Sequence, residues 1–308
     1  MNIAAGLLAA QTARFERVDP MLPPAAPPPD GTVFTAALAD GERVAGIVVR
    51  DSYEPGTAPT LWSARDVWEL HPLVGAAGGP GMDALLRELA RAIGREATGP
   101  DSACLVTWPS RDVEVAKPLL AHGFMPLSTL AVRAADHPAD HPRGRLAVRL
   151  ATTRDLDTAL ELELAELAYS ALVGAAIERP DARRVKREAL ARHLEQGDPV
   201  WLAEHDGVVV GLAHGRLVDA TPGAATGTRL RTGRWGYVNC VSVRPDARGT
   251  GVGRRLMAVA HRELVRHGGA GTFLYYNPPN PLASVFWPRQ GYRPLWTIWE
   301  VRPAGALR

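Results

Sequence analysis

The residues with the clearest chemical meaning form a glycine-rich run between an apolar strand-like segment, residues 237–243, and an amphipathic helix-like segment, residues 254–266. A glycine-rich turn at the start of a helix leaves several backbone N–H groups unpaired, and the helix dipole adds partial positive charge there. Such a turn binds anions, and glycine lets a pyrophosphate approach the backbone closely. Either of the two arginines in the run would add a charge-assisted contact. The run consists of Arg248, Gly249, Thr250, Gly251, Val252, Gly253 and Arg254.

Spacing separates three kinds of phosphate-binding turn. A P-loop needs a Gly-Lys pair, and the sequence contains none. A dinucleotide-binding turn needs a third glycine, which would fall on Arg254 or Leu256 here. The third pattern is Gln or Arg, two residues, Gly, one residue, and Gly or Ala, and it fits from Arg248 onward, after Val243 and Pro245. This run resembles the acyl-CoA pyrophosphate loop of GCN5-related N-acetyltransferases (GNATs).

A second segment, residues 280–292, resembles the same family. Trp287 stands where many members carry the Tyr that protonates the leaving thiolate, and an indole N–H does not transfer protons at neutral pH. The resemblance implies that Asn280 and Trp287 contact the cofactor. It leaves three other tyrosines as proton donors, namely Tyr275, Tyr276 and Tyr292. The matching residues are Asn280, Ala283, Phe286, Gly291 and Tyr292.

The resemblance covers residues 146–301 and implies where the rest of acetyl-CoA would lie. In the family, a splayed pair of parallel strands offers backbone groups to the pantetheine arm. By position, that role falls on the main chain of Val241, Ser242 and Val243. The acceptor amine would enter beside the first two helices of this half and the loop before Tyr237.

Transfer to an amine also requires a base, because an unperturbed alkyl amine is protonated at pH 7. Many relatives carry a Glu near the start of the strand before the glycine loop, where this sequence has Trp235, Tyr237 and Asn239. Cys240 lies mid-strand, where we expect a small buried hydrophobe rather than a nucleophile. The remaining candidate bases are His214, Asp219 and Glu300.

The elements that position these residues recur along the chain. Residues 123–129, GFMPLST, reappear as GYRPLWT at residues 291–297, an offset of 168. Residues 33–49 and 200–215 each contain two apolar runs joined around an Asp-Gly pair, which predicts a β-hairpin. Two elements repeated in the same order at nearly constant spacing favour a duplication.

Hydrophobic periodicity predicts alternating helices and strands in the second copy. This alternation predicts an α+β fold. The resemblance and the repeat together imply two tandem GNAT-like domains, each with a mixed, mostly antiparallel central sheet flanked by helices. The expected strands are 146–150, 237–243, 272–276 and 295–301; the helices are 155–172, 183–194, 254–266 and 283–289; and a long loop spans 216–236.

The first copy retains the glycines but loses phosphate-binding groups. Its expected strand is 67–70, followed by a loop and helix at 76–93. Ala76 replaces the arginine, and Pro80 removes one N–H donor. We predict that this half lacks a functional CoA site and serves for packing or for shaping the acceptor cleft.

The polar, proline-punctuated segment 134–145 predicts the boundary between domains 1–140 and 141–308. This architecture resembles that of bacterial tandem acetyltransferases. Only Lys117 and Lys186 are lysines among 35 basic residues, which indicates a high-GC bacterial coding bias.

The composition bounds the remaining possibilities. A chain of 308 residues with 46% apolar and 22% charged residues is typical of a folded protein of about two domains. A net charge of +2 gives no reason to expect a nucleic-acid or membrane partner. Cys104 and Cys240 have no metal-ligand spacing, so we expect no metal. Residues 1–13 are too short to span a bilayer and have no preceding basic residue, so we expect a helix and a cytoplasmic protein.

Together these features predict an acetyl-CoA-dependent N-acetyltransferase that acts, through its second half, on the primary amine of an unidentified small molecule, either a small amine or an aminoglycoside-like compound. A homodimer is left open. One alternative is a non-catalytic acyl-CoA-binding or sensing protein, which the tryptophan at 287 and the missing Glu would suit. Another is an aminoacyl-tRNA-dependent transferase of the tandem peptidoglycan type, which would not bind CoA and which the intact glycine loop disfavours.

Overall fold

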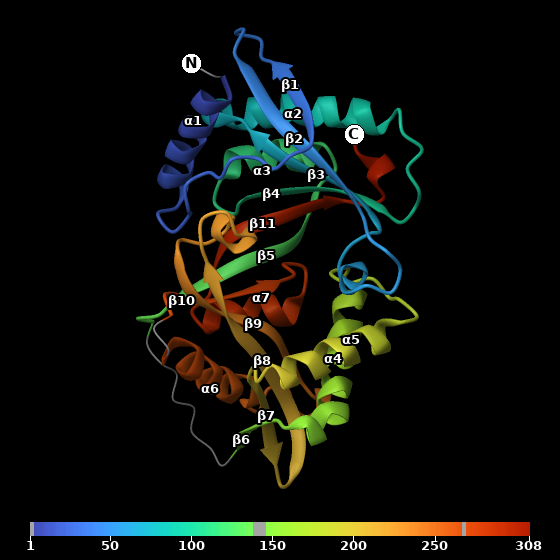
Figure 1. Cartoon of the computed structure of the whole chain (residues 1–308), viewed down its shortest axis with the longest axis vertical. Helices are drawn as coiled ribbons and strands as arrows, with labels where there is room; N and C mark the ends of the chain where they lie inside the picture. Colours follow the sequence, from blue (N-terminus) through green and yellow to red (C-terminus); the bar gives the residue numbers. More distant parts are fainter. Residues whose placement is uncertain (1–2, 138–145, 267–268) are drawn as a thin grey trace.

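The computed structural model describes residues 3–137, 146–266 and 269–308, and its strands form one mixed sheet of 11 strands (Figure 1). The first half contains α1 (Ile3–Val18), β1 (Thr32–Ala37), β2 (Arg43–Ser52), β3 (Asp66–Leu73), α2 (Gly78–Ile93), β4 (Ser102–Pro109), α3 (Val113–Ala121) and β5 (Met125–Ala134). The second half contains β6 (Ala147–Leu150), α4 (Leu156–Leu172), α5 (Ala182–Glu195), β7 (Val200–His205), β8 (Val208–Ala220), β9 (Gly233–Val243), α6 (Val252–Arg266), β10 (Gly271–Tyr276), α7 (Pro281–Arg289) and β11 (Arg293–Val301).

The succession from β1 to β5 repeats from β7 to β11. Each copy has a hairpin, a short 3-10 turn, a pair of parallel strands connected by a helix, a second helix and a last strand. Both predicted hairpins are present, at β1–β2 and β7–β8. The predicted loop 216–236 was too long, because β8 and β9 remain paired as far as Ala220 and Gly233. Backbone pairing extends these strands through polar residues that carry no hydrophobic pattern.

The last strands of the two halves are exchanged within the sheet. The strand order is β1-β2-β3-β4-β11-β5-β10-β9-β8-β7-β6, so β11 lies between β4 and β5, and β5 lies between β11 and β10. Thr129 of β5 pairs with Thr297 of β11, and these are the equivalent last residues of the repeated seven-residue segment. The halves are therefore related by an approximate twofold axis near this pair, and their two expected sheets are continuous.

Helices cover both faces of the second half (Figure 1). One face packs under α6 and α7, with Leu256 and Met257 in its core, and the other packs under α4 and α5, with Leu160 and Leu190 in its core. The first half contacts α4 and α5 through the 3-10 turn Ala58–Leu61. Its other helices, α1, α2 and α3, lie around its own core.

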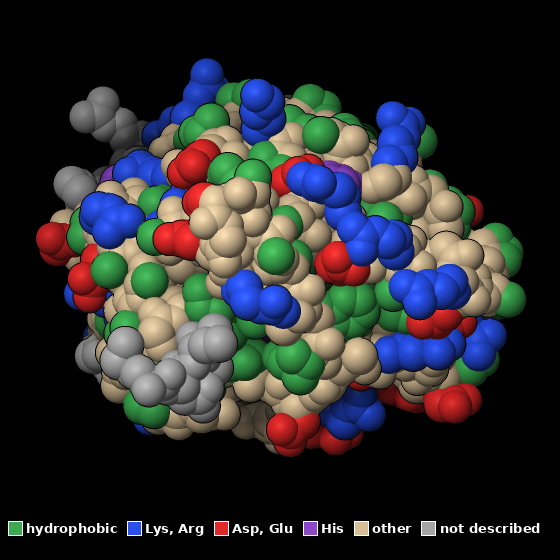
Figure 2. Space-filling view, turned by 90° about the horizontal axis from the view of Figure 1, so that it is seen from above, with side chains coloured by type: hydrophobic (Ala, Val, Ile, Leu, Met, Phe, Trp, Pro, Cys, Tyr) green, Lys and Arg blue, Asp and Glu red, His purple; other side chains and the backbone are tan. Residues whose placement is uncertain are grey.

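Two further features bear on function. No helix within residues 3–137, 146–266 and 269–308 is long and apolar enough to cross a membrane. At the first-half end of the molecule, basic and acidic side chains are interspersed rather than gathered by sign (Figure 2). Of the predicted boundary segment 134–145, residues 138–145 lie outside the described part of the chain.

Candidate active site

The glycine loop connects β9 to α6 and has open space beside it. Gly249 and Gly251 have φ angles of 79° and 93°, a left-handed backbone that side chains rarely adopt. A Cβ atom added to either glycine would meet no atom within 4 Å. The Thr250 hydroxyl donates a 2.7 Å hydrogen bond to the Ala247 carbonyl and so ties the loop to the preceding turn. Because the first N–H groups of a helix lack intrahelical acceptors, the loop and the start of α6 fit an anionic group such as a pyrophosphate.

Neighbouring side chains frame this loop. Arg248 is exposed, its Nε donates to the Val243 carbonyl at 3.2 Å, and its guanidinium lies 5.5 Å from the Tyr169 ring on α4. Gly253 has a different purpose, because a Cβ there would lie 3.3 Å from the Phe286 ring of α7. The third glycine of the run therefore lets α7 pack against α6.

The strands β9 and β10 form the splayed parallel pair that the resemblance implied. They pair only from Trp235–Gly271 to Tyr237–Phe273, after which β9 continues six residues to Val243. On its opposite edge, this part of β9 pairs with β8, for example Ser242 with Leu212. The edge of residues 238–243 that faces β10 therefore has no strand partner within the described chain. Its main-chain groups can bind an extended ligand that ends at the glycine loop.

A β-bulge interrupts β9 where the strands diverge. His214 of β8 pairs with Cys240, but the next β8 residue, Gly215, pairs with Val238. Asn239 is therefore an extra, exposed residue, and its Nδ2 lies 3.1 Å from His214 Nε2. Bulges redirect side chains and free backbone groups. Hydrophobic alternation does not reveal this one.

A buried ionic cluster lies on the α4–α5 side of the bulge. Glu163 lies 2.7 Å from Lys186 Nζ and 3.0 Å from His214 Nε2, and all three residues are buried. Burial alone would raise the pKa of Glu163, but the charges of His214 and Lys186 outweigh burial and lower that pKa to about 2. The same carboxylate raises the pKa of Lys186 against the effect of burial. The side chains hold one another in place.

Sequence reasoning found His214 but missed its partners. Two signals were present. Glu163 falls on the apolar face of α4 among leucines and alanines, and Lys186 is one of only two lysines in an arginine-rich chain. A carboxylate and an ammonium at core positions of adjacent helices point to a buried ion pair.

Glu166 lies one helical turn beyond Glu163 and is half-buried against the sheet. Ser170 donates a 2.6 Å hydrogen bond to it, and burial raises its pKa. Its charge also contributes, after burial, to the raised pKa of Cys240, which packs against Leu160 and Leu162 on the α4 side of the sheet. Cys240 is buried in the core, as predicted, with its thiol neutral.

The structure separates the predicted tyrosines. Tyr292 is buried under α6, where its hydroxyl lies 2.8 Å from Thr272 Oγ1 and 3.0 Å from His261 Nε2. It is part of the core and contacts β10 at Thr272, where β10 is still paired with β9, before the two strands diverge. Tyr276 is half-buried at the end of β10, and burial raises its pKa. Tyr275, its neighbour on the opposite face, lies 6.3 Å from the Tyr237 ring.

The other predicted residues occupy distinct places. Asn280 caps α7 by accepting hydrogen bonds from the N–H groups of Leu282 and Ala283 at 3.0 and 3.1 Å. Trp287 is buried beside Phe286 and Tyr292, so its contact with a cofactor stays a prediction. Asp219 pairs with Arg234 on the surface, and Glu300 lies in β11, away from the His214 cluster and next to Arg302.

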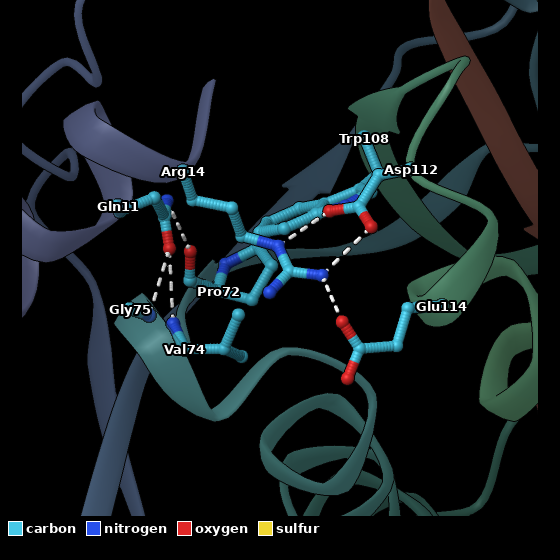
Figure 3. Close-up of polar contacts among 8 residues, drawn as sticks. All are labelled: Gln11, Arg14, Pro72, Val74, Gly75, Trp108, Asp112 and Glu114. Atoms are coloured by element: carbon cyan, nitrogen blue, oxygen red, sulfur yellow. Dashed lines mark hydrogen bonds and ion pairs between the residues drawn. The ribbon is translucent and has the colours of Figure 1, made fainter. Parts of the chain in front are cut away.

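In the first half, α1 occupies the place that corresponds to the cofactor region (Figure 3). Gln11 Oε1 accepts a 3.0 Å hydrogen bond from the N–H of Val74, and its Nε2 donates one of 2.9 Å to the Pro72 carbonyl. These main-chain groups belong to the end of β3, the counterpart of β9. In the first half, the Gln11 side chain therefore makes hydrogen bonds with main-chain groups at the end of β3. The counterparts of these groups in β9 have no strand partner on that edge within the described chain.

The Arg14 side chain, also from α1, lies against the start of α2. It contacts both Asp112 oxygens at 2.6 and 2.7 Å and Glu114 at 2.6 Å. A Cβ on Gly78 would lie 2.5 Å from its guanidinium, and one on Gly79 would lie 2.8 Å from the Glu114 carbonyl. The glycines of this half allow close packing and leave no room for a pyrophosphate.

Comparisons with known proteins agree with this geometry. Residues 163–292 match the acetyltransferase (GNAT) family. No curated protein matches the chain. A GCN5-related N-acetyltransferase from Sphaerobacter thermophilus is 16% identical, with 87% of this chain and 80% of that chain covered and a TM-score of 0.54. A predicted acetyltransferase from Clostridium acetobutylicum, solved with acetyl-CoA, is 18% identical, with 48% and 90% covered and a TM-score of 0.39.

The family match runs from the middle of α4 to the end of α7 and includes the splayed strands and the glycine loop. The Sphaerobacter structure extends the likeness of fold over most of both halves. The second half therefore contains a domain of the acetyltransferase (GNAT) family, and the likeness of the rest of the chain is one of fold.

Proposed function

We propose that the chain is an acetyl-CoA-dependent N-acetyltransferase whose second half transfers an acetyl group to the primary amine of a small molecule. The observation that carries this proposal is an open glycine loop that follows the part of β9, residues 238–243, whose edge toward β10 has no strand partner within the described chain. The loop suits a pyrophosphate, and the free strand edge suits an amide-containing arm. A cytoplasmic location and a small-molecule partner, with no nucleic acid or membrane, belong to the same proposal.

The residues on the donor side follow from the geometry. Backbone groups from Gly249 to Gly253 and the Arg248 side chain would hold the pyrophosphate. The main chain of Val241, Ser242 and Val243 would hold the pantetheine. Acetyl-CoA would supply an activated thioester at the mouth of the splay. Because α1 fills the equivalent region of the first half, we expect one cofactor site in each chain.

On the acceptor side, we assign the base to Glu166. Burial raises the pKa of Glu166 and makes its carboxylate a stronger base than an ordinary glutamate, whereas the His214 ring already contacts Glu163 and Asn239. The neutral amine nitrogen would bond to the thioester carbon, and the carbon–sulfur bond would break. The amine proton would pass to Glu166. Tyr276, kept protonated by its raised pKa, would supply the thiolate proton.

The decisive experiment compares two glycines with the same backbone conformation and the same open space, of which only one lies in the proposed CoA loop. Gly251→Val should weaken CoA binding at least tenfold, because it places a branched side chain where the pyrophosphate lies. Gly41→Val is the matched control, since Gly41 has a φ of 86°, equally open space, and a position in the first hairpin. It should change the dissociation constant less than twofold in calorimetry. Equal losses in both variants would contradict the proposed loop.

The alternative is an acyl-CoA-binding or sensing protein without catalysis. It is favoured by Trp287, which cannot act as a proton donor, and by the lack of a carboxylate at 235, 237 and 239. Thiol release from acetyl-CoA over a panel of amines, measured beside binding, separates the two. Tight binding without release on any amine would support the sensor.

A further inference from the structure

Asn239, the extra residue of the β9 bulge, is an exposed polar residue at the divergence of β9 and β10. The proposed donor site places the pyrophosphate at residues 249–253 and the pantetheine at residues 241–243. Continued in the same direction along β9, this order brings the acyl end of the donor to residues 238–240. Asn239 would therefore lie next to the thioester, although it has no part in holding the pyrophosphate or the pantetheine.

The Asn239 side chain lies on the acceptor side of the sheet. It contacts His214, whose Nε2 lies 3.0 Å from Glu163 of α4. Glu166, the proposed base, follows Glu163 by three residues and so projects from the same face of α4. This helix packs against the sheet beside β9. The Asn239 amide and the proposed base are therefore on the same side of β9, where the acceptor amine would enter.

One end of the Asn239 amide is held and the other end is free. Its Nδ2 lies 3.1 Å from His214 Nε2, and because an amide nitrogen only donates, the ring nitrogen accepts this hydrogen bond when it carries no proton. With a proton, the same nitrogen would donate to Glu163 instead. Asn239 Oδ1 has no hydrogen-bond partner within the described residues. It is an acceptor on an exposed residue, directed away from the ring that holds the amide.

His214 is a rigid support for this amide. The ring is 4% exposed and packs edge-on against His193 of α5, with 4.8 Å between the ring centroids. The neighbouring Glu163 carboxylate is itself paired with Lys186 Nζ of α5 at 2.7 Å. An extra residue in a bulge has no regular place in the strand ladder. The contact with the fixed His214 ring therefore sets the direction of the Asn239 side chain.

We propose that Asn239 Oδ1 accepts a hydrogen bond from the acceptor amine and so directs its nitrogen lone pair at the thioester carbon, and that His214 positions Asn239 for this task. The nitrogen–carbon bond forms and the carbon–sulfur bond breaks. The amine proton passes to Glu166, and the thiolate takes the proton of Tyr276. Asn239 is then a catalytic residue and His214 a positioning residue. The inference rests on the proposed function and deepens it.

Hydroxylamine is a suitable probe, because it is small and mostly neutral at pH 7. Its nitrogen would bond to the acetyl carbon, and the products, acetohydroxamic acid and CoA thiol, are both measurable. Asn239→Ala should lower kcat/KM for hydroxylamine about 10²-fold, mostly through kcat, because a misdirected nucleophile reacts slowly. The CoA dissociation constant should change less than twofold. Gln196→Ala, which removes an exposed amide side chain at the end of α5, should retain the wild-type kcat/KM.

A double-mutant cycle tests the positioning role of His214. His214→Phe keeps a ring and removes the accepting nitrogen, and it should lower kcat/KM about tenfold. If His214 acts through Asn239, the double variant His214→Phe/Asn239→Ala should be no slower than Asn239→Ala alone. Independent effects would multiply to a loss of about 10³-fold, which is the result that a merely structural role of His214 predicts. Calorimetry with CoA confirms that each variant is folded.

The outcomes separate this inference from the proposed function. A wild-type kcat/KM in Asn239→Ala, with the wild type active, would overturn the role of Asn239 and leave the transferase in place. A multiplied loss in the double variant would overturn the positioning role of His214. If the wild type bound CoA but did not accelerate the formation of acetohydroxamic acid, the transferase itself would be contradicted, and this inference with it.

Discussion

At the scale of single residues, the glycines at the start of a helix have a different structural role in each half. Gly249 and Gly251 adopt left-handed backbone beside open space, where an added Cβ would meet nothing. Gly79 and Gly81 instead lie where a Cβ would come within 2.8 to 3.0 Å of neighbouring atoms. The first pair exposes backbone to a ligand, and the second lets α2 pack closely. Similar glycine spacing in a sequence therefore does not imply a shared ligand.

Glu166→Gln tests the proposed base. The amide cannot accept the amine proton, so kcat/KM should fall by roughly 10² to 10⁴ while the CoA dissociation constant stays the same. The pH profile should also lose the acidic limb that Glu166 sets. Glu161→Gln, at an exposed position on the same helix, should retain full activity. An unchanged kcat/KM in Glu166→Gln would exclude this carboxylate as the base.

His261 makes the protein sensitive to mild acid. Burial, with a smaller contribution from Arg133, lowers its pKa from 6.5 to about 3. The unfolded chain therefore binds a proton between these pH values that the folded chain does not, and stability falls as the pH drops below 6.5. The loss should reach about 2 kcal/mol at pH 5.

This pH effect can be measured by urea unfolding at pH 7 and pH 5. His261→Gln should remove about 2 kcal/mol of the difference between the two pH values. His205→Gln, at a residue with an exposed side chain, should leave the difference as it is. If His261→Gln lost as much stability as the wild type on acidification, the assignment would be wrong.

At the scale of elements, α1 acts as an internal substitute for a ligand. Gln11 pairs with the end of β3, Arg14 pairs with Asp112, and Phe15 packs edge-on against Trp108 and Trp296. One helix face thus fills the region that stays open in the second half. This packing would allow the first half to keep its fold without a cofactor.

Arg14→Ala tests the strength of this closure. Asp112 is 5% exposed, so removal of its partner leaves a buried carboxylate unpaired, which should destabilise the protein by about 3–5 kcal/mol. Arg17→Ala, at an exposed position of the same helix, should cost less than about 0.5 kcal/mol. Chemical unfolding measures both. The CoA dissociation constant of the folded Arg14→Ala protein should not change, and a second equivalent of bound CoA would show that Arg14 blocks a functional site.

At the scale of the whole molecule, the two halves share one sheet. Each half gives its last strand to the other, so β11 has both of its neighbours in the first half and β5 pairs with β10 of the second. Separation of the halves would expose unpaired strand edges. The folded chain should therefore behave as one cooperative unit.

Hydrogen exchange tests this cooperativity. Acetyl-CoA at about 100 times its dissociation constant should stabilise the native state by about 2.7 kcal/mol. If the halves unfold together, slow-exchanging amides in β2 and β3 should gain protection, although the ligand would bind beside β9. Increased protection confined to residues 146–308 would show that the halves unfold independently.

Local pattern was sufficient for the elements and for one functional loop. The periodicity of residues 155–172 and 183–194 predicts helices that the structure contains as α4 and α5, and the Asp-Gly pairs predict both hairpins. The run from Arg248 to Gly253 lies at the start of a helix, as predicted. These features depend on backbone geometry and on neighbours within a few residues, which the sequence records directly.

Tertiary structure decided the rest, because it depends on residues brought together from distant parts of the chain. No local pattern places β11 between β4 and β5, makes Asn239 the extra residue of a bulge, or brings Glu163 onto Lys186 and His214. The difference between the halves is of the same kind. Both halves carry glycines at the start of a helix. In the first half, α1 packs against these glycines and fills the space beside them. In the second half, the space beside the glycine loop is open.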